Sequence, residues 1–379
     1  SVTTSNTTGI TGSGVLTVHG TSSFTTSASG ADITLSSTNA FTGAVSLSTA
    51  GTTSNATLTT GTTALLFGTS TVNGDLSVTS AAAITQSGVL TVTGTTTITA
   101  DNSGTKQDVS LEDLTTGADA QNQFSGAVSV TGNWVKLGTA NGIILGDITT
   151  ADANGHFTLD PNQSGGNTGS VTQAAGTALD IYQKTIITAT GIDVLLTSTT
   201  NDMTRVAGAQ IRVAGTNVEI VDIDNIELGT ITATGLLKVT AGGAVTNSSG
   251  QGALTITGAT TIQAKSGSTY YDVTLDHADS DFTGSVSITG EDVAVLDATA
   301  IVLGTSTATG TYQVTTTNGD ITNDGDLTIT GGATFTSSTT GKSIELGSAG
   351  NAFSSWVKMK ADTGGDEAFG NIEFVDSGP

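Results

Sequence analysis

Cysteine is absent from the sequence of 379 residues, and proline occurs only twice. Without cysteine, disulfide bonds and thiol chemistry are excluded, and the absence fits a protein outside the cell. Only ten lysine and arginine residues stand against 33 acidic ones, and the resulting net charge of −23 would repel nucleic acid as a partner. No stretch approaches the roughly 18–20 continuous apolar residues of a membrane helix, so we expect no membrane insertion.

Small, hydroxyl-bearing and β-branched residues replace the missing types. Glycine alone accounts for 50 residues, and charged residues make up 11%, against about 25% in ordinary globular domains. Disorder is one alternative for so biased a composition. However, hydrophobic residues make up 36% of the chain and are regularly placed, and the β-branched ones suit half-buried strands. We therefore expect an ordered protein built from strands.

The sequence repeats itself, and three markers show the period. A phrase of an aromatic residue, small residues and valine, in some copies loosened, has its third residue at 43, 126, 208, 284 and 355, which gives steps of 83, 82, 76 and 71. A Leu-Thr-Val/Ile-Thr-Gly phrase recurs at 90–94, 254–258 and 327–331, with a variant at 16–20. Leucine or phenylalanine followed by glycine recurs at Gly68, Gly146, Gly229 and Gly304. Three markers in one phase predict an array of stacked units.

Each repeat divides into short apolar runs that alternate with Thr, Ser or Ala. Residues 254–326 predict four consecutive turns of roughly 16 to 20 residues each. A barrel or a sandwich would also use short strands, but sandwich strands alternate over longer stretches. We predict an all-β, right-handed parallel β-helix (β-solenoid) of roughly 20 coils of about 19 residues. It would run continuously over 1–379 in about five imperfect repeats: 1–68, 69–146, 147–229, 230–304 and 305–379.

The repeat phrase resembles that of a known group of proteins. A Gly-x-Leu-Thr-Val/Ile-x-Gly phrase, followed by Thr-x-Ile and an Asp-Val-x-Leu strand, is similar to the β-helical repeats of filamentous haemagglutinin-type exoproteins and giant bacterial surface adhesins. The resemblance extends from about residue 10 to 360. It implies a β-helical shaft at the cell surface, without the secretion domain of that family.

The two ends of the chain match each other in phase. The stretch from Val2 through Ile10 corresponds to the fourth turn of a repeat, whereas the stretch containing Ile372 and Phe374 corresponds to a third turn. A second copy placed end to end would continue the solenoid, so these four residues are the candidate joining positions. Such a head-to-tail contact builds a filament if it does not close. The alternative is that the sequence is one piece of a much longer array.

Acidic residues supply the candidate cation sites. The aspartates Asp32, Asp108, Asp193 and Asp272 begin one strand in four units, where they would bind a cation or hydrogen-bond local backbone. Denser clusters at 222–224, 276–281 and 323–326 are interpreted as solvated acidic loops. The second of these clusters is the best calcium candidate, with Asp276, Asp279 and Asp281 as ligands. We expect no other cofactor.

Catalytic patterns find little support in the sequence. The three histidines His19, His156 and His277 fall in different repeats, and neither a Gly-x-Ser-x-Gly nor a His-Glu-x-x-His phrase occurs. We therefore expect a non-enzymatic, extracellular structural protein, a subunit of a head-to-tail self-assembling filament or the shaft of a surface adhesin. Its partners would be further copies of itself and glycans of a host or neighbouring cell. The alternatives are a carbohydrate-binding or polysaccharide-degrading β-helix and an ice-binding surface of threonine rows.

Overall fold

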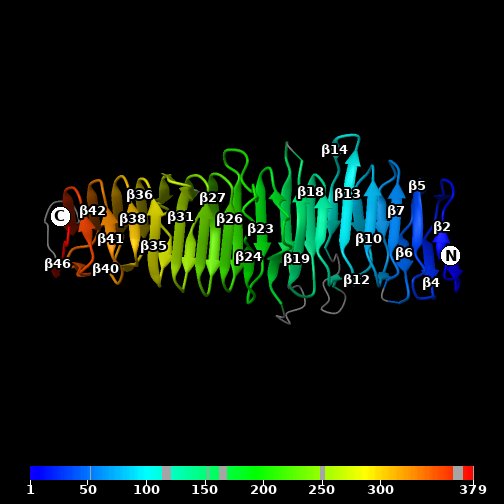
Figure 1. Ribbon diagram of the computed structural model, residues 1–379, viewed down its shortest axis with the longest axis horizontal. Coiled ribbons are helices and arrows are strands. Elements are labelled where there is room, and N and C mark those ends of the chain that lie inside the picture. The colour runs from blue at the N-terminus through cyan, green and yellow to red at the C-terminus, as the bar shows by residue number, and fades with distance from the viewer. Residues whose placement is uncertain are drawn as a thin grey trace. The chain divides into compact units, whose positions relative to one another are not determined.

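Stacked, parallel β-strands make up the computed structural model of the chain (Figure 1). The structure describes residues 1–51, 53–112, 121–151, 153–161, 169–247, 252–361 and 370–378. Two compact units divide the chain, Ser1–Asp193 and Val194–Pro379. Both units are β-solenoids, and together they contain about 15 turns. The described residues contain no helix. Consequently, no described helix could span a bilayer.

The strands of the first unit form two sheets, A and B, which alternate along the chain. Sheet A contains β1 (Val2–Thr4), β4 (Ser22–Thr26), β6 (Val45–Ser48), β8 (Leu65–Phe67), β9 (Ser70–Val72), β11 (Ile84–Gln86), β12 (Leu90–Val92), β15 (Val109–Leu111), β16 (Gln123–Phe124), β18 (Trp134–Gly138), β20 (His156–Asp160) and β23 (Lys184–Thr188). Sheet B contains β2 (Ile10–Thr11), β3 (Thr17–Val18), β5 (Ile33–Phe41), β7 (Ala56–Thr60), β10 (Leu76–Ser80), β13 (Thr96–Asn102), β17 (Val128–Thr131), β19 (Ile143–Thr149), β21 (Val171–Gln173) and β22 (Leu179–Asp180).

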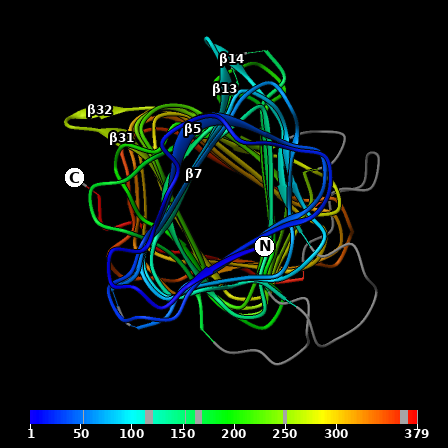
Figure 2. The ribbon, with the colours of Figure 1, turned by 90° about the vertical axis from the view of Figure 1, so that its right-hand side faces the viewer.

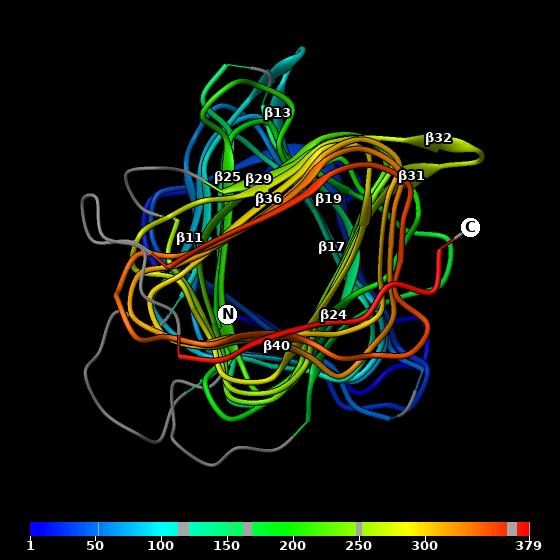
Figure 3. The ribbon, with the colours of Figure 1, turned by 90° about the vertical axis from the view of Figure 1, so that its left-hand side faces the viewer.

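The second unit repeats this arrangement. Its sheet A contains β25 (Gln210–Gly215), β27 (Ile226–Ala233), β29 (Val245–Asn247), β30 (Leu254–Ile256), β33 (Val273–Leu275), β34 (Asp281–Phe282), β36 (Val293–Asp297), β39 (Tyr312–Thr316), β42 (Ala333–Ser337) and β45 (Val357–Ala361). Its sheet B contains β24 (Val194–Leu196), β26 (Val218–Asp222), β28 (Leu237–Ala241), β31 (Thr260–Ser266), β35 (Ser285–Gly290), β37 (Ile301–Leu303), β38 (Ser306–Ala308), β40 (Ile321–Asn323), β41 (Leu327–Ile329), β43 (Ile344–Leu346), β44 (Ala352–Phe353) and β46 (Ile372–Phe374). Figure 3 shows β29 and β36 along one side of this coil and β40 along another.

Successive turns pair in register, and their inward side chains form continuous apolar columns. Leu58, Val78, Ile98 and Val130 are register partners on four consecutive turns, and all four are buried. Residues on either side of them point outward, as the period of two in a strand requires. The described turns number about 15 rather than the roughly 20 that we predicted. The reason is that a turn is longer than 19 residues: Val78 is paired with Ile98, and Ile98 with Val130.

Two sequence markers meet at one corner of the coil, where glycine stacks on glycine. Gly94 of the Leu-Thr-Val-Thr-Gly phrase lies under Gly126 of the next turn, and Gly258 lies under Gly284 in the same way. A Cβ atom added to Gly284 would lie 2.3 Å from the carbonyl oxygen of Gly258. The backbones therefore approach more closely here than any side chain permits, which explains why both markers end in, or centre on, glycine.

The third marker identifies a one-residue bulge that recurs in four of the five repeats. Pairing brings Val45 opposite Phe67 and Ser48 opposite Thr71, so three steps on one turn face four on the next. The same extra residue occurs where Val128 faces Leu145, where Ile211 faces Leu228 and where Val286 faces Leu303. In each case the glycine of the Leu/Phe-Gly marker follows the paired residue. The bulge bends one turn relative to the turn before it.

Among the described residues, two antiparallel hairpins leave the coil, one in each unit. In the first, β13 continues outward and returns as β14 (Thr105–Lys106); in the second, β31 returns as β32 (Thr269–Tyr270). Both hairpins project from the coil in Figure 2. The sequence gives no sign of these hairpins, because their strands continue the alternating pattern of the coil.

Candidate functional site

Three of the four aspartates that precede a strand in successive repeats, Asp32, Asp108 and Asp272, hydrogen-bond to the neighbouring turn. Oδ1 of Asp32 accepts the backbone N–H of Asn55 at 2.7 Å, and Oδ1 of Asp272 accepts that of Asp292 at 3.2 Å. Asp108 accepts the N–H of Trp134 at 3.2 Å. These carboxylates therefore connect turns, whereas the sequence offered a cation site or a bond to local backbone as their roles.

This side-chain ladder continues over several turns of the first unit. Asn55 Oδ1 in turn accepts the N–H of Asp75 at 2.7 Å, and Asp75 Oδ1 accepts both the N–H of Thr95 at 2.7 Å and its hydroxyl at 2.8 Å. Asn55 and Asp75 each accept a bond from the next turn and donate one to the turn before. The result is an Asx ladder, defined here as Asp32, Asn55, Asp75 and Thr95, which runs beside the backbone ladders.

Two of the predicted calcium ligands lie in the loop between β33 and β34 of the second unit, and the third begins β34. Asp276 and Asp279 are exposed, and Asp281 is half-buried, with Oδ1 accepting the hydroxyl of Thr299 at 3.0 Å. The N–H of Asp279 donates to Nδ1 of His277 at 3.2 Å. Within the described part of the chain, no three acidic or histidine side chains come together as a metal site. Calcium binding at these aspartates stays a prediction, which isothermal titration with CaCl₂ can test.

The predicted joining residues carry exposed apolar surface. Val2 is 47% exposed in β1, Ile372 is 53% exposed and Phe374 is 41% exposed in β46, while Ile10 is half-buried. In the described residues, β1 pairs only with β4, and β46 pairs only with β43. Both strands therefore present one edge of unpaired backbone groups and a row of uncovered core side chains.

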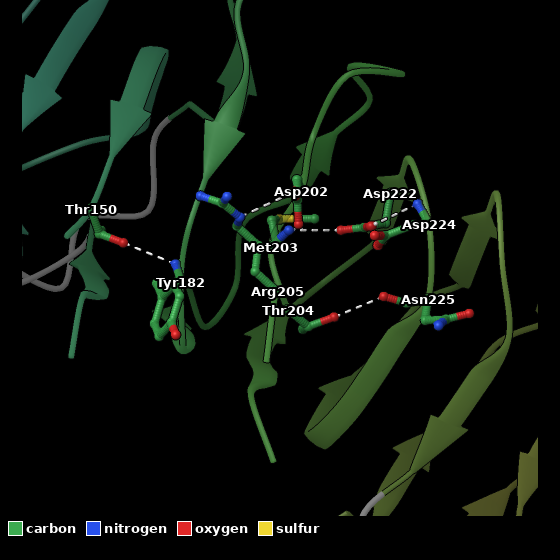
Figure 4. Close-up of polar contacts among 9 residues, drawn as sticks. All are labelled: Thr150, Tyr182, Asp202, Met203, Thr204, Arg205, Asp222, Asp224 and Asn225. Atoms are coloured by element: carbon green, nitrogen blue, oxygen red, sulfur yellow. Dashed lines mark hydrogen bonds and ion pairs between the residues drawn. The ribbon is translucent and has the colours of Figure 1, made fainter. Parts of the chain in front are cut away.

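A polar groove of about 390 Å³ lies in the second unit (Figure 4). Its lining includes Thr204, Arg205, Asp224, Asn225 and Glu227. The guanidinium of Arg205 pairs with the carboxylate of Asp202 at 3.3 Å, and the hydroxyl of Thr204 donates to the carbonyl of Asn225 at 2.9 Å. The groove combines a cation with carboxylates, so a small polar molecule is the kind of ligand that it could hold.

Asp222, beside this groove, is buried and not in a solvated acidic loop as its cluster suggested. Its side chain is 2% exposed, and burial raises its pKa to about 7, with a further increase from the Asp224 carboxylate. The N–H groups of Met203 and Asp224, at 2.9 and 3.2 Å, oppose this shift. Because both oxygens accept backbone N–H groups, the carboxylate ties two turns together rather than facing a substrate.

An equivalent buried carboxylate lies one repeat later. Asp297 ends β36 as Asp222 ends β26, and its oxygens accept the N–H of Phe282 at 3.0 Å and that of Thr299 at 2.6 Å. Burial raises the pKa of Asp297 as well. Sequence reasoning missed this pair. The available signal was an aspartate closing the alternating runs Val218–Asp222 and Val293–Asp297.

An aromatic and basic surface lies on the first unit. Trp134 is 45% exposed, and its ring lies 5.3 Å from that of His156 on the next turn. The Nζ of Lys136 is 5.3 Å from the Trp134 ring and 3.2 Å from Glu112 Oε1. Partial burial, and then the positive charge of Lys184, lower the pKa of His156. The turns of about 19 residues predicted from the sequence gave no signal that these residues meet.

A family model described as repeats of unknown function (DUF5649) matches the chain over residues 1–48, 53–131, 215–289 and 290–359. The last three matched segments are 70 to 79 residues long, close to the spacing of the sequence markers. No curated protein and no solved structure matches the chain. The repeats are therefore confirmed, and the comparisons assign them no activity.

Proposed function

The chain belongs to the DUF5649 family of repeats, and from this premise we propose that it is a non-enzymatic structural protein of the extracellular space. Its stacked turns would serve as the shaft of a surface adhesin or as the subunit of a filament. We take the winding to be right-handed, as is usual for parallel strands joined by crossover connections. The extracellular assignment rests on the resemblance of the repeat phrase to those of bacterial surface exoproteins and on the lack of cysteine.

One observation carries this proposal: adjacent turns are joined by side-chain ladders in addition to the backbone ladders. The Asx ladder supplies bonds of 2.7 Å between turns at one corner. Asp222 at the end of a sheet B strand and Asp297 at the end of a sheet A strand each supply a buried bond to the preceding turn. Because each turn of a solenoid contacts only its neighbours, bonds between turns determine how well the stack resists separation. A stiff shaft requires adjacent turns that resist separation, and these side-chain bonds add to that resistance.

The uncovered end strands support growth by stacking. The apolar side chains of Val2, Ile372 and Phe374, together with the open edges of β1 and β46, would be covered by one more turn. We propose that a second copy can supply that turn in a head-to-tail contact. Further turns of a longer chain would cover the same edges in the same way.

Sedimentation and electron microscopy of residues 1–379 test the assembly. We expect concentration-dependent filaments that disappear when residues 1–20 are deleted or when Ile372 and Phe374 are both changed to Asp. The Ile223→Asp variant is the control, because Ile223 is equally exposed, at 53%, but lies between β26 and β27. A monomer at all concentrations, or filaments unchanged by the deletion, would contradict head-to-tail growth while leaving the shaft proposal in place.

The shaft proposal has its own test against the enzymatic alternative. Incubation with a panel of plant and bacterial polysaccharides should release no reducing sugar above the level of a heat-treated sample. Release of reducing ends that depends on folded protein would overturn the assignment as a structural protein.

A further inference from the structure

The two tryptophans of the chain occur in the same tripeptide at the same place in the coil. Trp-Val-Lys stands at 134–136 and again at 356–358. In both copies the valine is the first inward position of a sheet A strand, β18 or β45, and the tryptophan precedes it. Trp134 is 45% and Trp356 is 61% exposed. Neither ring is needed to fill the core, so packing does not explain them.

Trp134 is continued by basic side chains on the two following turns. Strand register places His156 beside Trp134 and Lys184 beside His156. These three residues form a column, the platform, with neighbours separated by the spacing of adjacent strands, about 4.8 Å. Among the described residues, no carboxylate forms an ion pair with Lys184. In the second unit, Trp356 lies against Gly332 of the preceding turn, which offers no side chain.

The platform is held in place by bonds to its backbone. The N–H of Trp134 donates to Asp108 Oδ1 at 3.2 Å. Upstream of Lys184, the N–H of Tyr182 donates to the Thr150 hydroxyl at 2.9 Å (Figure 4), and the N–H of Gln183 donates to the Gly155 carbonyl at 3.0 Å. A ligand would therefore meet strand residues of fixed spacing, which lowers the cost of ordering them on binding.

We propose that this platform binds an acidic oligosaccharide, a chain of pyranose rings that carry carboxylates. The C–H face of a sugar ring is apolar and packs on an exposed indole, while Lys184 and Lys136 attract a carboxylate. His156, whose pKa is lowered, is mostly neutral at pH 7 and offers a hydrogen bond to a hydroxyl. The spacing between turns is close to the length of one pyranose residue, so neighbouring sugars can follow neighbouring turns.

A nucleic acid strand is the other polymer that combines rings with negative charge. The net charge of −23 disfavours a ligand with a phosphate at every residue, and Glu112, which pairs with Lys136, adds local repulsion. A saccharide whose carboxylates are fewer and lie against Lys184 meets less of this repulsion. The structure therefore favours the acidic saccharide.

Tryptophan fluorescence gives a direct test, because the Trp356→Phe variant leaves Trp134 as the only indole. Titration of this variant with a six-residue hyaluronan oligosaccharide, which carries a carboxylate on every second ring, should change the fluorescence saturably, and a neutral cello-oligosaccharide of the same length should bind at least tenfold more weakly. By calorimetry, Trp134→Ala should weaken binding of the hyaluronan oligosaccharide at least tenfold, and Lys184→Gln should weaken it about three- to tenfold. Trp356→Ala is the matched control and should change the affinity less than twofold.

The same titrations can overturn the proposal. Equal affinity for the neutral sugar, unchanged binding by Lys184→Gln, or equal losses in Trp134→Ala and Trp356→Ala would each contradict an acidic-saccharide site at Trp134. Tighter binding of a single-stranded oligonucleotide would assign the surface to the other class of polymer. The shaft and its assembly are measured separately, so either result leaves those experiments intact.

Discussion

The buried hydroxyl of Ser306 accepts the backbone N–H of Ile288 on the preceding turn at 3.0 Å. It also donates to the carbonyl of Gly304, two residues earlier, at 3.0 Å. Ser70 makes the same two bonds in an earlier repeat. Its hydroxyl accepts the N–H of Leu47 at 3.0 Å and donates to the carbonyl of Gly68 at 2.9 Å. A serine two residues after the marker glycine thus satisfies backbone groups that the one-residue bulge leaves without ladder partners.

Replacing this serine should lower the free energy of unfolding, because the bulge then leaves a backbone group without a hydrogen bond. In Ser306→Ala the buried N–H of Ile288 loses its acceptor, and we expect a destabilisation of about 1–3 kcal/mol. The urea midpoint should fall, and amide hydrogen exchange in β35 should increase. Thr307→Ala, one residue away on the half-buried outer face, is the control and should leave both nearly unchanged. Equal protection of β35 in Ser306→Ala and the parent chain would show that the hydroxyl is dispensable.

A second prediction concerns the glycine corner. A Cβ at Gly284 would lie 2.3 Å from the carbonyl oxygen of Gly258, so Gly284→Ala must push two turns apart. We expect a loss of about 1–3 kcal/mol, typical of overpacking, and a lower melting temperature. Gly14→Ala is the control, since a Cβ there meets nothing within 4 Å. Similar melting temperatures for the two variants would mean that the backbone accommodates the methyl group.

These corners show what the sequence could and could not predict. The strands and their parallel stacking follow from alternation such as Leu76–Ser80, and the period follows from repeated phrases. The structure has fewer turns than the sequence predicted, because the corners and the hairpin at β13 and β14 take up residues without breaking the alternating pattern. Contacts between turns, such as Trp134 with His156, depend on the length of each turn. That length is set by bulges and glycine contacts, which no local pattern of apolar residues records.

The Asx ladder predicts that two substitutions of Asp75 differ in their effect on stability. Asp75 Oδ1 accepts the N–H and the hydroxyl of Thr95, and it lies at an exposed corner. Asp75→Ala should therefore cost about 0.5–1.5 kcal/mol, whereas Asp75→Asn keeps an acceptor oxygen and should cost little. Asn55 already occupies the equivalent place one turn earlier. Chemical unfolding in urea measures both variants, and equal losses would indicate that charge, rather than the hydrogen bond, matters at this corner.

Asp222 makes stability depend on pH in an unusual direction. Its pKa rises from an ordinary value of 3.8 to about 7 in the folded chain. Between these values the folded state keeps a proton that the unfolded state has lost, so the contribution to stability is full below about pH 4. It is lost as the pH rises and is constant above about 7. The shift corresponds to a change on the order of 4 kcal/mol.

The Asp222→Asn variant isolates this contribution from the general repulsion among acidic groups. Its amide has one acceptor oxygen for the two N–H groups of Met203 and Asp224, so the variant should be less stable than the parent at pH 4. The difference should shrink or reverse by pH 8, because only the parent must then hold a buried charge. Urea midpoints between pH 4 and 8 measure it, with the exposed Asp276→Asn as the control that should follow the parent. Parallel curves for Asp222→Asn and the parent would place the titration elsewhere in the chain.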